Sequence, residues 1–364
     1  MQKAVFFANY GSPYEGNFIV SLKLLEKRLN LNGINVAYVF PMRTKERDWV
    51  GQLKEENNEV FFLSDSKMKA VSEMKNIIEH AAFVHTHFIN MEQMLILRLA
   101  RIISGSQCPV IHHIHNHFEN SNNIIKKIVK AWSLHSDYML ACGSGVCDSI
   151  KEAGLKNEAA YIDNGIDFER LNHYAESVFA PEGCQILMFG FDYKRKGVDL
   201  AVKACQQLRK ENKNVHLNIS LSRNLEVVEE EIKRILGEVP EWISLLPPRN
   251  DIATYYRGAD LFISPSREEG LCYSLIEAAY CGCVVVASHI SGQYELDIPQ
   301  LIWCKKDDSG DLANKISEVL DMKQETRQSI IQEQKRAVME KYSVERWADE
   351  VEQYYYDRKI IRRV

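Results

Sequence analysis

Short apolar runs alternate with longer amphipathic segments along most of the chain, and this alternation restricts the fold more than any other feature of the sequence. The apolar run at residues 4–8 is followed by the segment 18–29, where apolar side chains recur at helical spacing. Further strands are predicted in the first half at residues 36–40, 60–63, 83–88, 110–115, 138–142 and 160–162. Strands separated by helix-length segments are typical of a parallel sheet covered by helices.

The sequence Asn-Gly-Ile-Asp at residues 164–167 is a turn signal, and the alternation begins again after a polar stretch that extends to Glu182. Strands are predicted in the second half at residues 186–189, 215–220, 243–246, 261–264, 284–288 and 301–304. We therefore expect an α/β protein with two Rossmann-like, doubly wound domains that face a central cleft. The expected boundaries are 1–170 and 171–340 for the two domains, and 341–364 for a C-terminal helix that crosses back to the first domain.

Composition excludes several classes of protein. The net charge of −5 and the pI of about 6.2 give no general attraction to a polyanion such as nucleic acid. The nine cysteines are odd in number and stand mostly in apolar surroundings, unlike a secreted disulfide framework, so we expect a reducing, cytoplasmic compartment. No stretch approaches the ~18 apolar residues of a membrane span, and the sequence predicts a soluble or peripheral protein.

Two glutamates, Glu269 and Glu277, lie in the segment that joins the predicted strand 261–264 to a helix. If the helix begins near Cys272, Glu269 precedes its N-terminus and Glu277 lies inside it. The free amides and the positive dipole end of a helix N-terminus bind anions. The amides expected to face a diphosphate are those of Gly270, Leu271, Cys272 and Tyr273. Carboxylates accept hydrogen bonds from hydroxyls, so the glutamates suit a sugar ring and a ribose. The alternative is a capping glutamate and a glutamate on a solvated helix face.

Three consecutive cations, Lys194, Arg195 and Lys196, precede Gly197 just beyond the predicted strand 186–189. Ligands of doubly wound sheets bind at the carboxyl ends of the strands. The run therefore predicts a phosphate contact, although such a run also suits a solvated helix start.

These two segments resemble the family 4 retaining glycosyltransferases, whose hallmark is Glu-x7-Glu in a Pro-Ser-x-x-Glu-Gly context, followed by Glu-Ala and a glycine before an apolar strand. The matching residues are Glu269, Gly270, Glu277, Ala278 and Gly282. The resemblance implies the GT-B fold and a nucleotide diphosphate sugar as donor, UDP-sugar above all. It also implies transfer with retention of anomeric configuration.

The resemblance implies roles for individual residues. Lys196 would contact the donor diphosphate and neutralise charge on the leaving group, Glu269 would hold the sugar hydroxyls, and Glu277 would hold the ribose. Phe191 stands where many relatives have an arginine that also contacts the phosphates, and we expect Lys194 or Arg195 to take over that contact. We expect Lys196 and Glu277 to lie at the ligand and not in a core.

In the first half, Gly16 and Asn17 lie where members of the family carry a glycine-rich loop that lines the cleft opposite the donor. A tight strand-to-helix turn is the alternative. The strand at 110–115 resembles one that ends in a cleft histidine in the family. His115 would then contact the transferred sugar or the acceptor.

Histidines alternate in two predicted strands, as His85 and His87 and then as His113, His115 and His117, so that each set could point to one side. Imidazoles in such sets can bind zinc. No Cys-x-x-Cys, His-Glu-x-x-His or Asp-x-Asp sequence accompanies them. We therefore expect no metal site, and no cofactor besides the donor substrate.

The sequence thus predicts a retaining, metal-independent hexosyltransferase or related enzyme that moves a sugar to a hydroxyl, in bacterial surface polysaccharide or glycoconjugate synthesis. The expected acceptor is a lipid-linked glycan or a protein, and nucleic acid is not an expected partner. Lys126, Lys127 and Lys130 predict contact with an anionic membrane at its inner face. An ordinary packed helix with a solvated basic face is the alternative for these lysines. The alternatives are a catalytically silent GT-B partner subunit of a related transferase, or a GT-B epimerase or phosphorylase.

Overall fold

The computed structural model describes residues 2–116, 124–134, 137–154, 159–179 and 182–362. The chain forms two compact units, and the C-terminal segment belongs to the same unit as the N-terminus. The first unit comprises Met1–Gly165 and Val344–Val364, and the second comprises Ile166–Ser343. The sequence placed these boundaries at residues 170 and 340.

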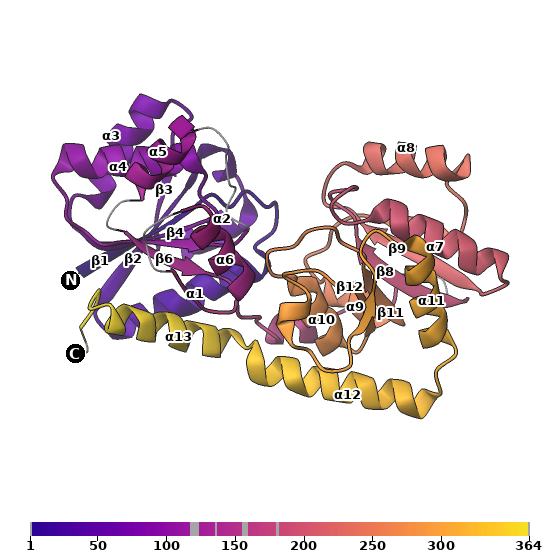
Figure 1. The fold of residues 1–364 in the computed structure, drawn as a ribbon. Helices are drawn as coiled ribbons and strands as arrows, with labels where there is room; N and C mark the ends of the chain where they lie inside the picture. The colour runs from indigo at the N-terminus through magenta and orange to yellow at the C-terminus, as the bar shows by residue number, and fades with distance from the viewer. Residues whose placement is uncertain (1, 117–123, 135–136, 155–158, 180–181, 363–364) are drawn as a thin grey trace. The chain divides into compact units, whose positions relative to one another are not determined.

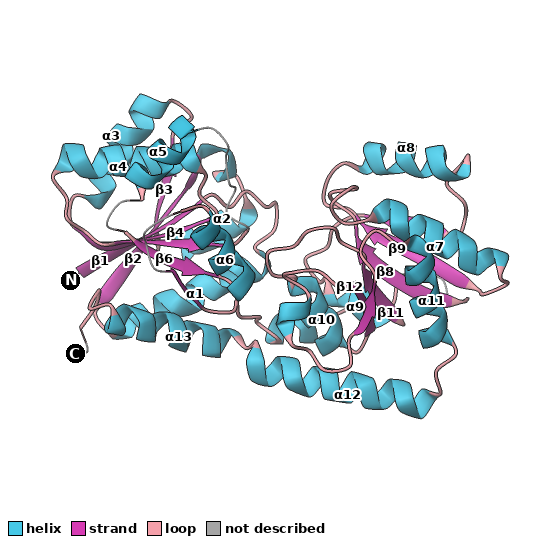
Figure 2. Ribbon diagram, in the orientation of Figure 1, coloured by secondary structure: helices cyan, strands magenta, loops and turns pink. Residues whose placement is uncertain are grey.

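The first unit contains a parallel sheet in the order β3-β2-β1-β4-β5-β6-β7. Figure 2 shows strands in magenta with helices around them. Its strands are β1 (Gln2–Ala8), β2 (Ile34–Pro41), β3 (Glu59–Leu63), β4 (Ala81–His87), β5 (Val110–Ile114), β6 (Tyr138–Ala141) and β7 (Ala159–Tyr161). Strands such as β1 and β2 are apolar almost throughout, as expected where helices cover both faces of a sheet. The parallel α/β class predicted from the sequence is confirmed.

The helices of the first unit lie on both faces of this sheet (Figure 1). They are α1 (Gly16–Leu31), α2 (Asp48–Glu55), α3 (Lys67–Ile78), α4 (Met91–Ser104), α5 (Ile124–Ser133), α6 (Ser144–Glu152) and α13 (Val344–Asp357), with the 3-10 turn η1 (Met42–Thr44). Helix α4 shows how the sequence sets an element's limits. Asn90 and Gln93 form a capping box at its start, and Gly105 ends it with a φ of 68°. Helices α3, α4 and α5 lie over one face, and α1 and α13 lie over the other.

Helix α13 completes the core of the first unit. Its buried residues Trp347, Val351 and Tyr355 pack in one apolar cluster with side chains of α1 and of the sheet. Arg28 of α1 forms an ion pair with Asp349 of α13, which fixes the two helices side by side. The C-terminal helix that the sequence predicted is therefore an integral layer of the first unit.

The second unit contains a parallel sheet in the order β10-β9-β8-β11-β12-β13. Its strands are β8 (Cys184–Phe189), β9 (Val215–Ser220), β10 (Ile243–Leu246), β11 (Leu261–Ser264), β12 (Val284–Ser288) and β13 (Ile302–Cys304). Its helices are α7 (Val198–Lys210), α8 (Leu225–Leu236), α9 (Ala253–Gly258), α10 (Tyr273–Cys281), α11 (Ser309–Leu320) and α12 (Gln324–Lys341), with the 3-10 turns η2 (Glu169–Asn172) and η3 (Tyr294–Leu296).

Alternation along β8 divides the core of the second unit into two layers. Ile186 and Met188 pack with residues of α7, α8 and α11, whereas Leu187 between them packs with residues of α9 and α10. Strands β8 and β11 are neighbours, so the loops that follow their carboxyl ends meet at one edge of the sheet. Within the part of the chain that the structure describes, no helix has both the length and the apolar character needed to cross a membrane.

Candidate functional site

The loop after β8 and the loop after β11 meet at Gly197, where any side chain would force the two backbones apart. Gly197 begins α7 with a φ of 68°, and a Cβ placed on it would lie 2.0 Å from the carbonyl oxygen of Pro265. The backbone N–H of Arg267 donates to the carbonyl of Arg195 at 2.8 Å. The cation run therefore lies against the segment that leads to Glu269.

Glu269 collects most of the polar contacts at this point. Its Oε1 lies 2.5 Å from Nζ of Lys196 and accepts a hydrogen bond from the hydroxyl of Ser266 at 2.8 Å. Its Oε2 lies 3.2 Å from Nη1 of Arg195. Glu269 and Lys196 are 6% and 8% exposed, so this ion pair lies at the edge of the core and is less screened by water than a surface pair.

Glu277 is a buried residue with two strong partners. It forms an ion pair with Arg170 of η2, and the hydroxyl of Tyr256 in α9 donates to its Oε2 at 2.8 Å. Burial and the adjacent carboxylate raise the pKa of Tyr256 well above its usual value, so the phenol remains a donor. Lys196 and Glu277 are both buried, since each is only 8% exposed, whereas the sequence placed them outside a core.

The N-terminus of α10 is partly satisfied by the protein itself. The amide of Cys272 donates to the carbonyl of Gly292 at 3.1 Å, and the amide of Tyr273 donates to the carbonyl of Leu271 at 3.1 Å. Gly292 approaches so closely that a Cβ on it would lie 2.4 Å from the carbonyl oxygen of Glu269. Gly270 and Leu271 precede the helix in the same loop. Of the four amides that the sequence proposed for a diphosphate, two thus already have backbone acceptors.

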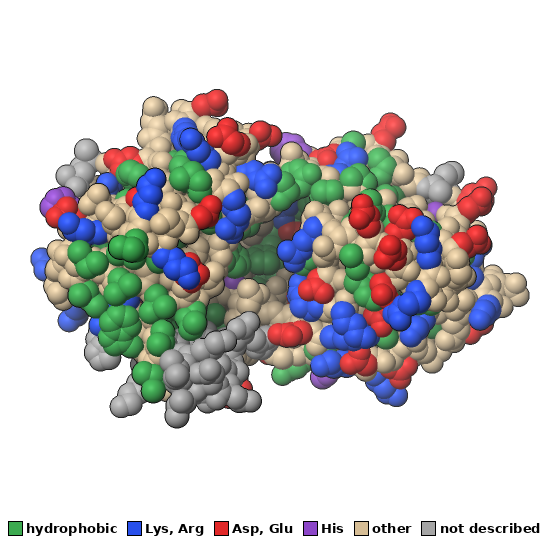
Figure 3. All heavy atoms as spheres, turned by 90° about the horizontal axis from the view of Figure 1, so that it is seen from above, with side chains coloured by type: hydrophobic (Ala, Val, Ile, Leu, Met, Phe, Trp, Pro, Cys, Tyr) green, Lys and Arg blue, Asp and Glu red, His purple; other side chains and the backbone are tan. Residues whose placement is uncertain are grey.

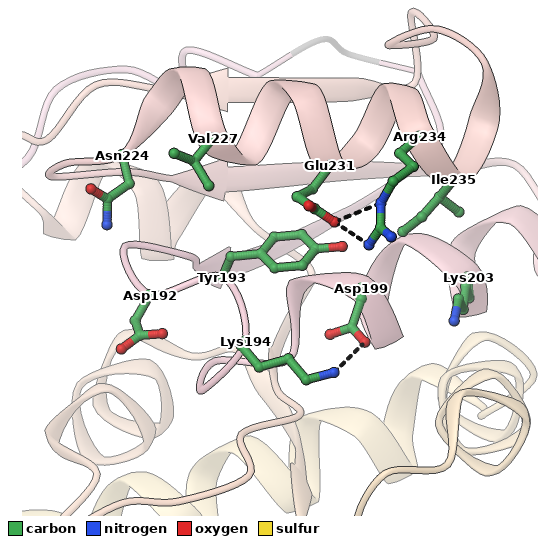
Figure 4. Close-up of a pocket in the computed structure, with 10 residues that line it drawn as sticks. All are labelled: Asp192, Tyr193, Lys194, Asp199, Lys203, Asn224, Val227, Glu231, Arg234 and Ile235. Carbon is green, nitrogen blue, oxygen red and sulfur yellow. Dashed lines mark hydrogen bonds and ion pairs between the residues drawn. The ribbon is translucent and has the colours of Figure 1, made fainter.

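Lys194 and Arg195 point in different directions, although they are neighbours in sequence. Arg195 contacts Glu269, whereas Nζ of Lys194 lies 3.8 Å from Asp199, and the Lys194 side chain is 74% exposed. Figure 4 shows Lys194 directed at Asp199 in a pocket of about 550 Å³ between α7 and α8, which Tyr193 and Arg234 also line. Lys194 is therefore not part of the group around Glu269.

Phe191 is surrounded by cations. Lys196, Arg195 and Arg223 lie 5.0, 5.3 and 5.4 Å from the centre of its ring. A ring face attracts such charges. Phe191 thus gathers three cations around the loop that follows β8.

The remaining candidates belong to the first unit. Gly16 begins α1 with a φ of 59°, and a Cβ on it would lie 2.8 Å from the hydroxyl of Tyr10. The Asn17 side chain donates to the carbonyl of Gly165 at 2.6 Å and so ties the first loop to the end of the unit's first segment.

His115 follows β5 and is 8% exposed. Its Nε2 lies 3.0 Å from Nδ1 of His87, and its ring stacks on Phe88, a non-glycine residue with a φ of 55°. Burial lowers the pKa of His115 to about 3, so its imidazole is neutral at physiological pH. His117 lies outside the described residues.

Sequence reasoning missed the residues that hold the glutamates in place. They are Arg170, Tyr256 and Ser266. Sequence reasoning also missed Arg267 and Gln293, which bind Asp199 and Ser264 in the neighbouring segments. Gln293 is fully buried and donates to the hydroxyl of Ser264 at 2.6 Å, and Arg267 forms a two-pronged ion pair with Asp199 at 2.8 and 2.9 Å. Arg170 lies 107 residues before Glu277, and no local pattern could have connected them.

Comparison with known proteins finds similarity to glycosyltransferases. The family model of group 1 glycosyl transferases matches residues 171–337. An uncharacterized glycosyltransferase of Methanocaldococcus jannaschii is 23% identical over 68% of this chain and 68% of its own length. An N,N'-diacetylbacillosaminyl-diphospho-undecaprenol alpha-1,3-N-acetylgalactosaminyltransferase of Campylobacter jejuni is 33% identical, but over only 22% of each chain.

Among solved structures, Anabaena HepE in complex with UDP-glucose has a TM-score of 0.78 at 16% identity, covering 98% of this chain and all of the other. At this identity the likeness establishes the fold. The chain has the GT-B fold of two Rossmann-like domains, and the family match to residues 171–337 supports a glycosyltransferase of group 1.

Proposed function

We propose that this protein is a retaining glycosyltransferase that moves a sugar from a nucleotide diphosphate sugar, UDP-sugar above all, to a hydroxyl acceptor. The observation that carries the proposal is the group formed by Lys196, Arg195 and Glu269 at the carboxyl ends of β8 and β11. Support comes from the family match to residues 171–337 and from the shared fold of HepE, whose complex contains UDP-glucose.

The charge arrangement suits a departing nucleoside diphosphate. Negative charge grows on the leaving phosphate oxygen as the glycosidic bond breaks, and a positioned cation stabilises that charge. The ammonium of Lys196 has three N–H donors, of which the described contact with Glu269 at 2.5 Å uses one. Lys196, with Arg195 beside it, would bind the diphosphate and supply the charge that a metal supplies elsewhere. Gly270 and Leu271 would bring further backbone amides to the diphosphate.

Glu269 and Glu277 would bind the two sugar rings of the donor, the transferred sugar and the ribose. Glu269 would accept hydrogen bonds from the transferred sugar, and its contacts with Lys196 and Ser266 would fix its orientation. Glu277 would accept hydrogen bonds from the ribose. Arg170 and Tyr256 hold that carboxylate in position, because each bonds a different oxygen.

The acceptor side would be formed by the first unit, with Gly16 and Asn17 in the loop before α1. The neutral imidazole of His115 would hydrogen-bond the transferred sugar or the acceptor without adding charge. Attack by the acceptor hydroxyl on the face from which the diphosphate leaves would retain the anomeric configuration and needs no covalent nucleophile. Burial raises the pKa of the Cys272 thiol, which keeps it protonated beside the site.

We also propose a role in the synthesis of surface polysaccharide or glycoconjugate, with an acceptor held at an anionic membrane. Hydrophobic side chains gather over α4 and α5 in the first unit (Figure 3). The exposed ones are Leu99, Ile102, Ile103, Ile128 and Trp132. The backbone of α5 also carries Lys126, Lys127 and Lys130, whose side chains lie outside the described residues. Basic residues beside exposed apolar ones suit peripheral binding to anionic lipid.

A nucleotide-release assay with a panel of UDP-, GDP- and ADP-sugars tests the activity. We expect sugar donors of one nucleotide class to release their nucleotide slowly without an acceptor and faster when a hydroxyl acceptor is added. Proton NMR of the product should show the anomeric configuration of the donor. An inverted product would contradict the retaining mechanism. Tight binding of nucleotide without release in any combination would favour a catalytically silent partner, and release of a sugar phosphate would favour a phosphorylase.

A further inference from the structure

Among the described residues of the first unit, five ring nitrogens of four buried histidines have no hydrogen-bond partner. They are Nε2 of His85, Nε2 of His87, both nitrogens of His113 and Nδ1 of His115. The first three histidines are at most 1% exposed. Buried polar atoms almost always have a partner, so a group of unpartnered nitrogens in one place requires an explanation.

Strand geometry brings these histidines to one face of the sheet. His85 and His87 are two residues apart in β4, and His87 is paired in register with His113 of β5. The rings of His85 and His113 are parallel, with centres 5.4 Å apart, and the ring centre of His87 lies 4.2 Å from that of His85. One ring nitrogen from each of the three lies within 4.8 Å of the corresponding nitrogens of the other two.

His112, on the opposite face of the same strand, shows what a structural histidine looks like here. Its Nδ1 lies 2.9 Å from the hydroxyl of Thr86, and its Nε2 lies 3.2 Å from Asp137. Asp137 is in turn paired with Arg101. Both nitrogens of His112 thus have partners although it is as buried as its neighbours, so burial in β5 does not by itself leave an imidazole unpaired.

We propose that His85, His87 and His113 bind a zinc ion, a site that goes beyond the proposed transfer reaction. Zinc is bound by imidazole nitrogens at about 2.0–2.1 Å in a tetrahedral arrangement, so the rings would have to rotate to bring the three nitrogens, now within 4.8 Å of one another, to the ion. The absence of carboxylate and carbonyl ligands among the three favours zinc over magnesium or calcium. The fourth position would be filled by water or hydroxide.

The second ring nitrogens of two of the ligands are already fixed. Nδ1 of His85 lies 2.6 Å from the hydroxyl of Tyr355, and Nδ1 of His87 lies 3.0 Å from Nε2 of His115. Metal-binding histidines usually donate their other N–H to such a partner, which sets the tautomer and the direction of the ring. These contacts leave Nε2 of His85 and of His87 for the ion, and Nε2 is the unpartnered atom in both cases.

The protonation state also suits a ligand. Burial, together with the neighbouring histidines, lowers the pKa of His85 to about 3 and the pKa values of His87 and His113 well below the usual range. Their lone pairs are therefore available at neutral pH, and a metal would not have to displace protons. Because Tyr355 belongs to α13, the ion would link β4 and β5 to the C-terminal helix.

The test measures metal content and does not depend on activity. We would express the full chain without a histidine tag in zinc-supplemented medium, dialyse it, and measure zinc by elemental analysis. We expect about one zinc per chain. Protein refolded with Co²⁺ in place of zinc should show the intense visible absorption of tetrahedral cobalt, and zinc-loaded protein should unfold at a higher temperature than protein refolded in chelator.

Two variants distinguish a ligand from a packed ring. His85→Phe and His113→Phe keep an aromatic ring in the stack but remove the ligand nitrogen, so each should lose at least nine-tenths of the bound zinc. His80→Phe, at an exposed position just before β4, is the matched control and should retain the metal. A parent chain that takes up no zinc in expression or refolding overturns the proposal. So does equal zinc uptake by the parent and the two variants.

Discussion

The ammonium of Lys196 lies 2.5 Å from the carboxylate of Glu269, although 73 residues separate them in the chain. Gly197 makes this contact sterically possible, since its backbone lies directly against Pro265. The loop after β8 and the loop after β11 are therefore joined by both a buried ion pair and a close backbone contact. Removal of either charge should change donor binding by a measurable amount.

We predict that Lys196→Met weakens UDP binding roughly 10- to 100-fold, because a hydrogen bond to a charged group contributes about 1.5–3 kcal/mol. Isothermal titration calorimetry with UDP measures the change. Lys203→Met, at an exposed position of α7, is the control and should bind UDP like the parent. Equal UDP affinity of Lys196→Met and the parent would remove Lys196 from the donor site.

The same experiment separates the neighbouring cations. Lys194 faces Asp199 and solvent, whereas Arg195 contacts Glu269. We expect Arg195→Met to weaken UDP binding more than Lys194→Met does. The opposite order would mean that Lys194 takes over the contact made by an arginine in relatives.

Glu277→Ala should destabilise the second unit by about 3–5 kcal/mol, because it leaves the largely buried Arg170 without its carboxylate. Thermal or urea unfolding monitored by circular dichroism measures this loss. The control is Glu318→Ala, which breaks an exposed pair with Lys315 at 2.7 Å and should change stability by less than about 1 kcal/mol. Unfolding of Glu277→Ala at the parent's midpoint would show that the buried pair is not needed for the fold.

Stability of the metal-free protein should fall as pH is lowered from about 6.5 toward 3. The folded-state pKa of His85 is about 3, below the 6.5 of an unperturbed histidine, so the unfolded state binds more protons in this window. The contribution of the neutral, buried His85 ring to the free energy of unfolding is complete above pH 6.5. It decreases as pH falls below 6.5 and is fully lost once pH has passed the folded-state pKa of about 3. For one such histidine the free energy of unfolding at pH 5 is about 2 kcal/mol lower than above pH 6.5.

His85→Phe tests this linkage, since it removes one proton-binding group and keeps a ring in place. Urea unfolding at pH 7.5 and pH 5 in the presence of chelator should show a smaller acid loss for His85→Phe than for the parent. An identical acid loss in both proteins would assign the effect to other groups.

Transfer should proceed at the full rate in excess chelator and should not be stimulated by Mn²⁺ or Mg²⁺. Cations of the protein, Lys196 and Arg195, would meet the diphosphate. The zinc proposed above belongs to the first unit, whereas these cations belong to the second. A brief chelator treatment that abolishes activity, with recovery on addition of Mn²⁺, would contradict a metal-independent transfer.

Binding to anionic vesicles should be weak and sensitive to salt. Each lysine near an anionic surface contributes about 1 kcal/mol, so Lys126, Lys127 and Lys130 changed together to Glu should abolish sedimentation with phosphatidylglycerol vesicles at low salt. The matched control changes Lys210, Lys233 and Lys323, which are exposed in the second unit, to Glu. If both triple variants sediment like the parent, α5 is not the membrane contact.

The strand pattern and the Lys196–Glu269 site could be predicted because their signals are local. Each strand is an apolar run between turn residues, and the two loops that carry Lys196 and Glu269 directly follow the carboxyl ends of β8 and β11. Parallel topology brings such ends to one edge without knowledge of side-chain contacts.

Burial and long-range pairing could not be predicted in this way. Glu277 looks like a residue on a polar helix face, yet Arg170 and Tyr256 arrive from two other elements and enclose it. The histidines of β4 and β5 were visible as an alternating pattern. Only the pairing of His87 with His113 between β4 and β5 shows that the two sets lie on one face of the sheet. That pairing cannot be deduced from the spacing of the histidines in the sequence.

The place of α13 in the first unit has a consequence for how the protein is made. Trp347, Val351 and Tyr355 are synthesised after the whole second unit but fill the core of the unit that begins first. During translation the second unit, whose residues are continuous, has its whole chain before the first unit has its last helix. The N-terminal sheet must therefore wait with part of one face uncovered, and its exposed apolar surface is a target for chaperones until α13 has been synthesised.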